Sequence, residues 1–271
     1  MEKIQINKNN NMKNQIYLCE IKGRKFIDIT NEERIHYLVE SSRDDKRSDF
    51  EKYLQRDDPP GFNEYKAKKF DSIKDVISKP ISISFDLIQE IDFDYLEEQL
   101  KDLEFESINF VNSKLDLLLP ENITKNVKTF FCNGNSKGII DLSKFCNLKY
   151  VNLLKWNNKV IFKGNNSILT NIIVWYYNPK SKSLKDILAD LKSIEYLEFN
   201  LTNIESLEGI EQLVSLKKIV INYGRNLKSV KNLNLCKKLE HIQFNNCKKI
   251  EDFELLDNKK GLKIENIRLP G

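Results

Sequence analysis

The sequence predicts an α/β solenoid, a coil of about eight short stacked units that share one continuous core. Three observations predict it. From Phe105 onward the chain keeps returning to the pattern apolar-x-x-apolar-x-apolar. Each copy alternates apolar and polar residues, as a short strand with one buried face does. The copies also follow one another at intervals of 22, 21, 21, 25, 22, 23 and 25 residues, and a fixed period of about 20–50 residues is typical of repeat architectures.

The copies define the expected strands of one parallel, concave sheet. They are FESINF (105–110), VKTFFC (127–132), LKYVNL (148–153), LTNIIV (169–174), IEYLEF (194–199), LKKIVI (216–221), LEHIQF (239–244) and IENIRL (264–269). Their fourth positions, which we expect to point inward, are Ile108, Phe130, Val151, Ile172, Leu197, Ile219, Ile242 and Ile267.

The segments between the copies predict tight turns on the outer side of the coil. After IEYLEF, apolar residues come at every third position, at Ile204, Leu207, Ile210 and Leu213. A step of three fits a 3-10 turn. SLKDILADLK (183–192) differs, since it opens on a serine and spaces its apolar residues four apart, so we expect an α-helix there.

At these residues the sequence resembles the leucine-rich-repeat family, whose repeat reads L-x-x-L-x-L-x-x-N-x-L over about 20–29 residues. IEYLEFNLTNIESLEGIEQLVSLKKIVI is most similar to the bacterial internalin-like type, with a repeat of about 22 residues. The resemblance covers roughly residues 80–271 and implies a solenoid that acts through its exposed faces. Asn135 keeps the family's asparagine that turns the chain out of a strand. Other residues stand at that position elsewhere: Ser113, Trp156, Tyr177, Thr202, Gly224 and Cys247.

Residues 1–75 lack the period and predict a small N-terminal α+β domain. IYLCEI (16–21) and RKFIDI (24–29) flank Lys22-Gly23 and predict a hairpin. Two capping boxes, one opening at Thr30 and one at Ser48, predict helices over about 31–41 and 48–55.

Residues 76–106 are expected to cap the solenoid before the repeats of 107–271. The stretch 85–106 holds nine acidic residues and one lysine. Leu96, Leu100 and Leu103 share one face of a predicted helix, and a solenoid needs such a polar-faced cap over its first unit. ISISF (81–85) can add one more strand.

Composition excludes several classes of protein. Forty-four Lys and Arg against forty Asp and Glu give a net charge of +4, too small to indicate nucleic-acid or membrane binding. The first twenty residues lack the apolar run of a signal peptide, and no stretch reaches the ~18 apolar residues needed to span a bilayer. Five scattered cysteines without a CxxC pair predict reduced thiols. We therefore expect a cytoplasmic protein.

No catalytic motif stands out in the sequence. A glycine-rich phosphate loop, GxSxG, HExxH and an EF-hand loop are all absent. The two histidines, His36 and His241, have no partner at a revealing spacing. We expect no metal, no cofactor and no enzymatic activity.

The concave face carries the functional prediction, because the residues between the inward positions point out of the sheet. They are polar in the end copies and aromatic or aliphatic in the middle ones, with Trp156 and Tyr177 expected at the adjacent rim. Copy by copy they are Ser107, Asn109, Val111; Thr129, Phe131, Asn133; Tyr150, Asn152, Leu154; Asn171, Ile173, Trp175; Tyr196, Glu198, Asn200; Lys218, Val220, Asn222; His241, Gln243, Asn245; and Asn266, Arg268.

Contiguous exposed apolar surface usually marks a site of association, and aromatic residues ringed by polar ones form the hot spots of protein interfaces. We therefore predict a protein partner. The residues expected to bind it are Phe131, Tyr150, Leu154, Ile173, Trp175, Tyr196, Glu198, Lys218, His241 and Gln243. Burial of this surface by residues 1–75 or by a return segment is an alternative. Nucleic acid is not expected, since only Lys218 and Arg268 would supply positive charge there.

Three narrower readings stay open. The partner can be a bacterial toxin, with this chain as its immunity protein, by analogy with repeat proteins of this size. Residues 1–75 can instead form a catalytic domain for which the repeats select substrate. The third reading is self-association through the C-terminal edge strand, which is followed closely by Pro270.

Overall fold

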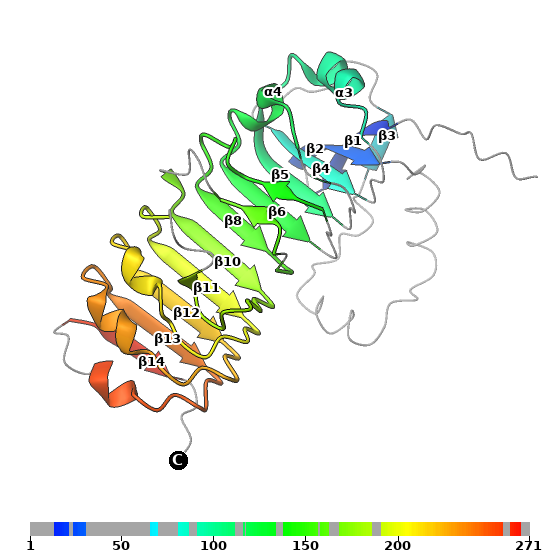
Figure 1. Cartoon of the computed structure of the whole chain (residues 1–271). Helices are drawn as coiled ribbons and strands as arrows, with labels where there is room; N and C mark the ends of the chain where they lie inside the picture. The colour runs from blue at the N-terminus through cyan, green and yellow to red at the C-terminus, as the bar shows by residue number, and fades with distance from the viewer. Residues whose placement is uncertain are drawn as a thin grey trace, which may run out of the picture.

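The computed structural model describes residues 14–21, 24–30, 66–69, 81–86, 91–111, 116, 118–133, 138–156, 158–162, 168–185, 191–256 and 261–266. Twelve of its strands form one long sheet, in the order β14-β13-β12-β11-β10-β8-β6-β5-β4-β2-β1-β3, and β7 and β9 pair separately (Figure 1). The strands are β1 (Gln15–Ile21), β2 (Arg24–Thr30), β3 (Lys66–Lys69), β4 (Ile81–Asp86), β5 (Phe105–Val111), β6 (Thr129–Asn133), β7 (Ile140–Asp141), β8 (Tyr150–Leu153), β9 (Val160–Ile161), β10 (Asn171–Trp175), β11 (Tyr196–Asn200), β12 (Lys218–Asn222), β13 (His241–Asn245) and β14 (Lys263–Asn266).

The parallel part of the sheet confirms the predicted repeat solenoid. From β5 to β13 each step of the pairing sets one predicted inward residue opposite the next: Ile108, Phe130, Val151, Ile172, Leu197, Ile219 and Ile242. All seven are 0% exposed. The predicted strand at ISISF is also confirmed, since β4 pairs with β5 and sets Ile83 opposite Ile108.

The prediction for the last copy is wrong by three residues. Ile264, and not Ile267, stands opposite Ile242, and Glu265 stands opposite Gln243. The structure thus keeps an interval of 22 residues between the last two strands. The outward positions there belong to Lys263 and Glu265, whereas the sequence analysis assigned them to Asn266 and Arg268. IENIRL carries the full apolar spacing and GLKIEN does not, so the motif alone pointed to the wrong register.

The N-terminal strands belong to the same sheet as the repeats. β1 and β2 form the predicted antiparallel hairpin, with Ile21 opposite Arg24. β2 then pairs in parallel with β4, and β3 pairs antiparallel with β1 at the end of the sheet. One sheet therefore contains strands from before and after residue 75 in the sequence. The division into a separate N-terminal domain stays a prediction. The helices predicted over 31–41 and 48–55, and residues 186–190 of the one predicted over 183–192, lie outside the described residues.

Helix α3 (Phe93–Leu100) lies within the predicted cap segment and connects β4 to β5. Asp92 caps it by accepting a hydrogen bond from the Tyr95 amide at 3.0 Å. Leu96, Leu100 and Leu103 are buried as predicted. A second short helix, α4 (Glu121–Thr124), precedes β6. Because β2, β1 and β3 lie beyond β4, the end of the sheet on this side is the hairpin and its partner β3, not α3.

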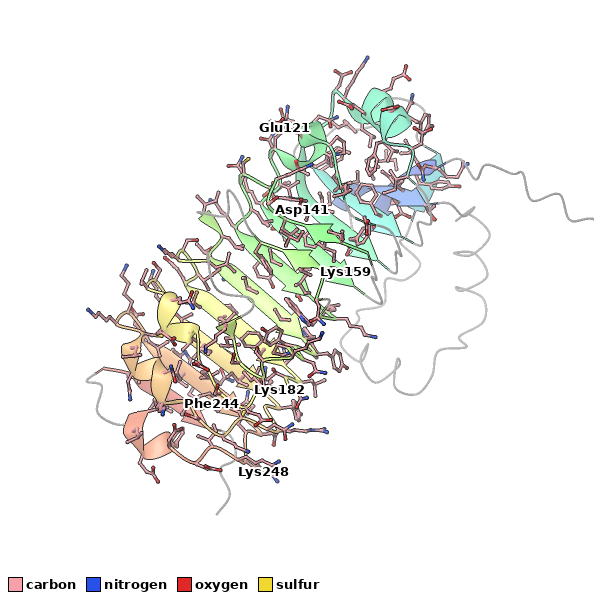
Figure 2. All side chains as sticks on the ribbon, in the orientation of Figure 1. Glu121, Asp141, Lys159, Lys182, Phe244 and Lys248 are labelled. Carbon is pink, nitrogen blue, oxygen red and sulfur yellow. The ribbon has the colours of Figure 1, made fainter. Side chains whose placement is uncertain are left out.

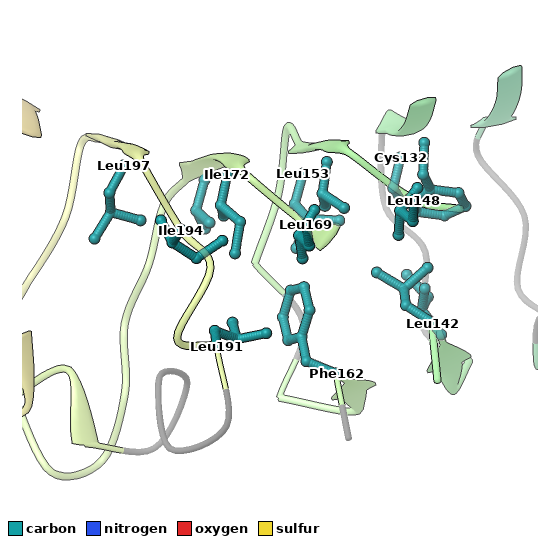
Figure 3. Close-up of a cluster of buried hydrophobic side chains, with 14 of the residues drawn as sticks. Cys132, Leu142, Leu148, Leu153, Phe162, Leu169, Ile172, Leu191, Ile194 and Leu197 are labelled. Atoms are coloured by element: carbon teal, nitrogen blue, oxygen red, sulfur yellow. The ribbon is translucent and has the colours of Figure 1, made fainter. Parts of the chain in front are cut away.

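The core runs without a break behind the sheet, because each unit packs its apolar side chains against those of its neighbours. Figure 3 shows Leu153, Leu169, Ile172, Ile194 and Leu197 meeting in this way under three successive strands. The side facing away from the sheet holds the 3-10 turns η4 (Ile210–Gln212), η5 (Lys231–Leu235) and η6 (Phe253–Leu256). The apolar residues spaced three apart before β12 are fully buried, which confirms their predicted role: Ile204, Leu207, Ile210 and Leu213.

The chain leaves four successive strands through the same turn. The residue after each strand has a left-handed backbone, although none is glycine: Tyr176, Leu201, Tyr223 and Asn246 have φ of 56° or 57°. The amides of the first three donate to the carbonyl oxygens of Asn200, Asn222 and Asn245 in the next repeat, at 2.7–2.8 Å. This backbone conformation costs about 1–2 kcal/mol for an L-residue. The hydrogen bond to the next repeat offsets that cost.

Thr202 and Cys247 stand where leucine-rich repeats usually have asparagine, and both side chains donate hydrogen bonds. Thr202 Oγ1 donates to the Tyr177 carbonyl at 3.0 Å, and Cys247 Sγ lies 3.4 Å from the Ile221 carbonyl oxygen. Burial raises the pKa of Cys247 to about 11, so its sulfur keeps its proton at neutral pH and can donate. Both acceptors lie in the preceding repeat, so these side chains tie each unit to its neighbour.

Thr202→Val should therefore lower the free energy of unfolding by about 1 kcal/mol at nearly unchanged volume, because the Tyr177 carbonyl loses its hydroxyl donor while it keeps the bond from the Asn203 amide. Thr202→Ser, which keeps the hydroxyl, is the matched control and should cost clearly less. Urea denaturation of the three proteins measures the difference. Equal losses for Val and Ser would show that the methyl group, not the hydrogen bond, matters at this turn.

Candidate functional site on the concave face

The strand register places the predicted binding residues in rows on the concave face of the sheet. One row runs through Tyr150, Tyr196, Lys218 and His241, with Asn171 between the two tyrosines. A second row runs through Phe131, Ile173, Glu198 and Gln243, with Asn152 and Val220 between them. Trp175 stands opposite Asn200 in a third row, and Leu154 directly follows β8. The structure therefore brings all ten residues to one face, as predicted.

The aromatic patch, as we call Phe131, Tyr150, Leu154, Ile173, Trp175 and Tyr196, spans the four neighbouring strands β6, β8, β10 and β11 and their ends. Phe131 is 38% exposed, and its ring packs against Tyr150 with centroids 5.7 Å apart at a tilt of 49°. The other members are half-buried. Phe131 and Tyr150 are thus already ordered against each other, which lowers the entropy cost of a contact made there.

Trp156 and Tyr177 do not form the rim predicted for them. Tyr177 is fully buried and packs between Trp156, at a centroid distance of 4.8 Å, and Phe199, at 5.1 Å. Trp156 is half-buried, and its indole Nε1 donates to Asn158 at 2.6 Å. The turn position that holds Tyr177, Thr202 and Cys247 points inward, since all three residues are buried. An aromatic residue at this position extends the core.

A ladder of hydrogen bonds adjoins the aromatic patch and ends on Glu198. Asn245 donates to Asn222, and Asn222 donates to Asn200 at 2.7 Å. Asn200 in turn donates to Glu198 Oε1 at 2.8 Å, and the Tyr196 hydroxyl donates to Oε2. Asn222 also reaches Oε1 at 3.4 Å. The carboxylate is thus held in one orientation by side chains from β11 and β12.

Tyr196 joins the aromatic patch to this polar ladder. Burial raises the pKa of its phenol, and the hydrogen bond to Glu198 raises it further. The hydroxyl therefore stays protonated and acts as a donor at physiological pH. Lys218 Nζ lies over the same ring, 5.8 Å from its centroid, a position that favours a cation–π contact.

The C-terminal part of the face is polar. His241 Nε2 lies 3.4 Å from Glu265 Oε2, and Glu265 also pairs with Lys263. This second contact lowers the pKa of the Glu265 carboxyl. Neither Lys263 nor Glu265 was among the predicted residues, because the sequence analysis placed the last strand three residues too late. A repeat of 22 residues counted from Ile242 places Ile264 inward, and Lys263 and Glu265 are then the outward neighbours.

One row of side chains on the N-terminal part of the face is buried. The register carries the row of Asn109 on to Ser84, Asp28 and Tyr17, and all three of these are less than 9% exposed. Sequence analysis missed this extension because it assigned the hairpin to another domain. Ser82, Ser107 and Asn109 on neighbouring positions of this face are half-buried, as are most members of the aromatic patch.

Charged side chains lie on the two sides of the sheet where its strands start and end. Figure 2 shows Lys182 and Lys248 on the side toward which the strands point, and Glu121 on the side from which they start. Among the described residues, no group of three or more His, Cys, Asp or Glu side chains is close enough to hold a metal ion. In the same part of the chain, no helix has the length and apolar character needed to cross a bilayer.

Comparison with known proteins supports the repeat assignment in general terms. No family model matches the chain. Over 139 residues the chain is 32% identical to an uncharacterized leucine-rich repeat-containing protein of Amsacta moorei entomopoxvirus. The match covers 48% of this chain and 26% of that protein. The chain therefore spans about a quarter of the length of this curated relative.

Proposed function

We propose that this chain is a non-enzymatic, cytoplasmic protein-binding module whose aromatic patch contacts a partner protein. One observation carries the proposal: aromatic and aliphatic side chains on four adjacent strands share one partly exposed face, with Asn152 and Asn171 among them and polar residues around them. Interface hot spots have this composition and this arrangement. The scattered cysteines without paired spacing support the cytoplasm as the location.

We also propose that the repeats follow the bacterial internalin-like pattern of about 22 residues. The observed pairing supports it where the spacing is most regular: Leu197, Ile219, Ile242 and Ile264 follow one another at 22, 23 and 22 residues. The 3-10 turns η4, η5 and η6 fit the same short return. In such a module the sheet is rigid, so the partner binds to a preformed surface.

Site-specific photocrosslinking tests the binding face. p-Benzoylphenylalanine in place of Phe131 should form a discrete adduct with one protein in the cells that make this chain. The same group in place of Leu235, which is 60% exposed on η5, should not. Adducts of equal pattern from both positions would contradict the proposal. An adduct of twice the chain's mass would identify a second copy as the partner.

Once the partner is identified, Trp175→Ala should weaken binding by about 2 kcal/mol, or ~30-fold in Kd. Trp175 has the largest side chain in the aromatic patch, so alanine at this position removes much of the surface available to the partner. Val214→Ala, at a residue 56% exposed outside the sheet, is the control and should leave Kd unchanged. Calorimetric titration measures both, and thermal unfolding verifies that the variants stay folded. An unchanged Kd for Trp175→Ala would rule the patch out as the binding face.

A further inference from the structure

Glu198 is the one acidic residue in the strands that carry the aromatic patch, β6, β8, β10 and β11. Its side chain is half-buried, and the register places it between Ile173 on one side and Val220 on the other. Trp175 on β10 is a diagonal neighbour by the same pairing, and Tyr196 lies two residues earlier on β11, on the same face. A partner that covers Ile173 and Trp175 therefore also covers the carboxylate.

No positive charge from the described part of the chain pairs with this carboxylate. The ion pairs found there join other residues, and the nearby Lys218 lies over the Tyr196 ring instead. Hydrogen bonds from Tyr196, Asn200 and Asn222 hold the group in place. These neutral donors orient the charge without cancelling it.

Covering such a group has a large energetic consequence. An ionised carboxylate that loses its remaining water is strongly destabilised unless a cation and further hydrogen bonds replace that water. A carboxylate accepts about four hydrogen bonds. From the described residues, Oε2 receives one hydrogen bond, from Tyr196, and Oε1 receives two. One oxygen therefore keeps a position for a donor from outside the chain.

We propose that the partner of this module places an arginine side chain against Glu198. This inference rests on the proposed function and specifies the chemistry of the partner. One guanidinium N–H donates to Oε2, and the plane of the group lies against the neighbouring Trp175. Arginine fits better than lysine, because a guanidinium is weakly hydrated and stacks on an aromatic face while it donates hydrogen bonds.

Lys218 weakens the binding of a cation at Glu198. It pairs in register with Tyr196, next to Glu198, so its charge repels an incoming cation. The cation–π contact with Tyr196 holds it to one side. Lys218→Met keeps the aliphatic stem and removes the charge. It should strengthen the binding of an arginine-bearing peptide about two- to fivefold at low salt, and less at high salt because ions screen the repulsion.

A random 12-residue peptide library on phage provides the probe. Phage selected on the full chain and then depleted on Trp175→Ala protein retain only peptides that need the aromatic patch. We expect arginine to be enriched in these peptides. A synthetic copy with citrulline, which is neutral and nearly the same shape, should bind the wild-type protein about tenfold more weakly or worse. Fluorescence polarisation measures the affinities.

Glu198→Gln is the matched variant, since it removes the charge and keeps the size of the side chain. The arginine and citrulline peptides should bind this variant about equally well. If citrulline costs the same in both proteins, or if peptides that depend on Trp175 lack arginine, the arginine inference is wrong while the binding face stands. If no peptide depends on Trp175, the proposed function fails and the inference fails with it.

Discussion

Tyr177→Ala should lower the free energy of unfolding by about 3–5 kcal/mol, which is typical of truncating a fully buried aromatic residue. The ring is in contact with Trp156 and Phe199, from the preceding and the following repeats. Its removal leaves a cavity that those two rings cannot fill from fixed strands. Chemical denaturation followed by circular dichroism measures the loss.

Tyr177→Phe separates packing from hydrogen bonding. The hydroxyl donates to the Ser183 carbonyl at a long 3.4 Å, so phenylalanine should cost only about 1 kcal/mol. A loss for Phe close to that for Ala would mean that the hydroxyl, rather than the ring, holds this turn. A loss below about 1 kcal/mol for Ala would contradict the burial of Tyr177.

Gly209→Ala should be the second strongly destabilising change, by about 3 kcal/mol. Gly209 has φ +100°, a left-handed backbone that an L-residue adopts only with strain. A Cβ there would also lie 2.8 Å from the Lys185 amide nitrogen and 3.0 Å from its Cα. These are backbone atoms, so they cannot move aside without disturbing the preceding repeat.

Gly261→Ala is the control for backbone strain alone. Gly261 has φ +87°, but a Cβ there would meet nothing within 4 Å. We expect a loss of about 1 kcal/mol. The difference between the two alanine variants in the same denaturation assay gives the contribution of the close approach. Equal losses would show that strain explains both positions and that the contact with Lys185 does not matter.

The strand pattern was sufficient to predict the core of the solenoid and the concave face. Inward residues such as Leu197 and Ile219 recur at a nearly fixed interval, and alternation alone then tells which neighbours point outward. All ten predicted residues lie on that face for this reason. Their role in binding stays a prediction.

Other features depend on contacts between distant segments, which the pattern does not contain. The hairpin of β1 and β2 joins the sheet through β4, more than fifty residues away, and no local signal indicates that pairing. Tyr177 was expected at the rim of the concave face; it lies inside, where its ring packs between those of Trp156 and Phe199. The ladder on Glu198 likewise needs the register of three strands.

The left-handed turn after β10, β11, β12 and β13 makes this architecture extensible. Because each repeat enters and leaves through the same backbone geometry, a whole unit of about 22 residues could be duplicated or deleted without a new kind of junction. The length of the module can then change in evolution, or by design, independently of the residues on its concave face. The length of such a protein and its binding specificity can therefore change independently of each other.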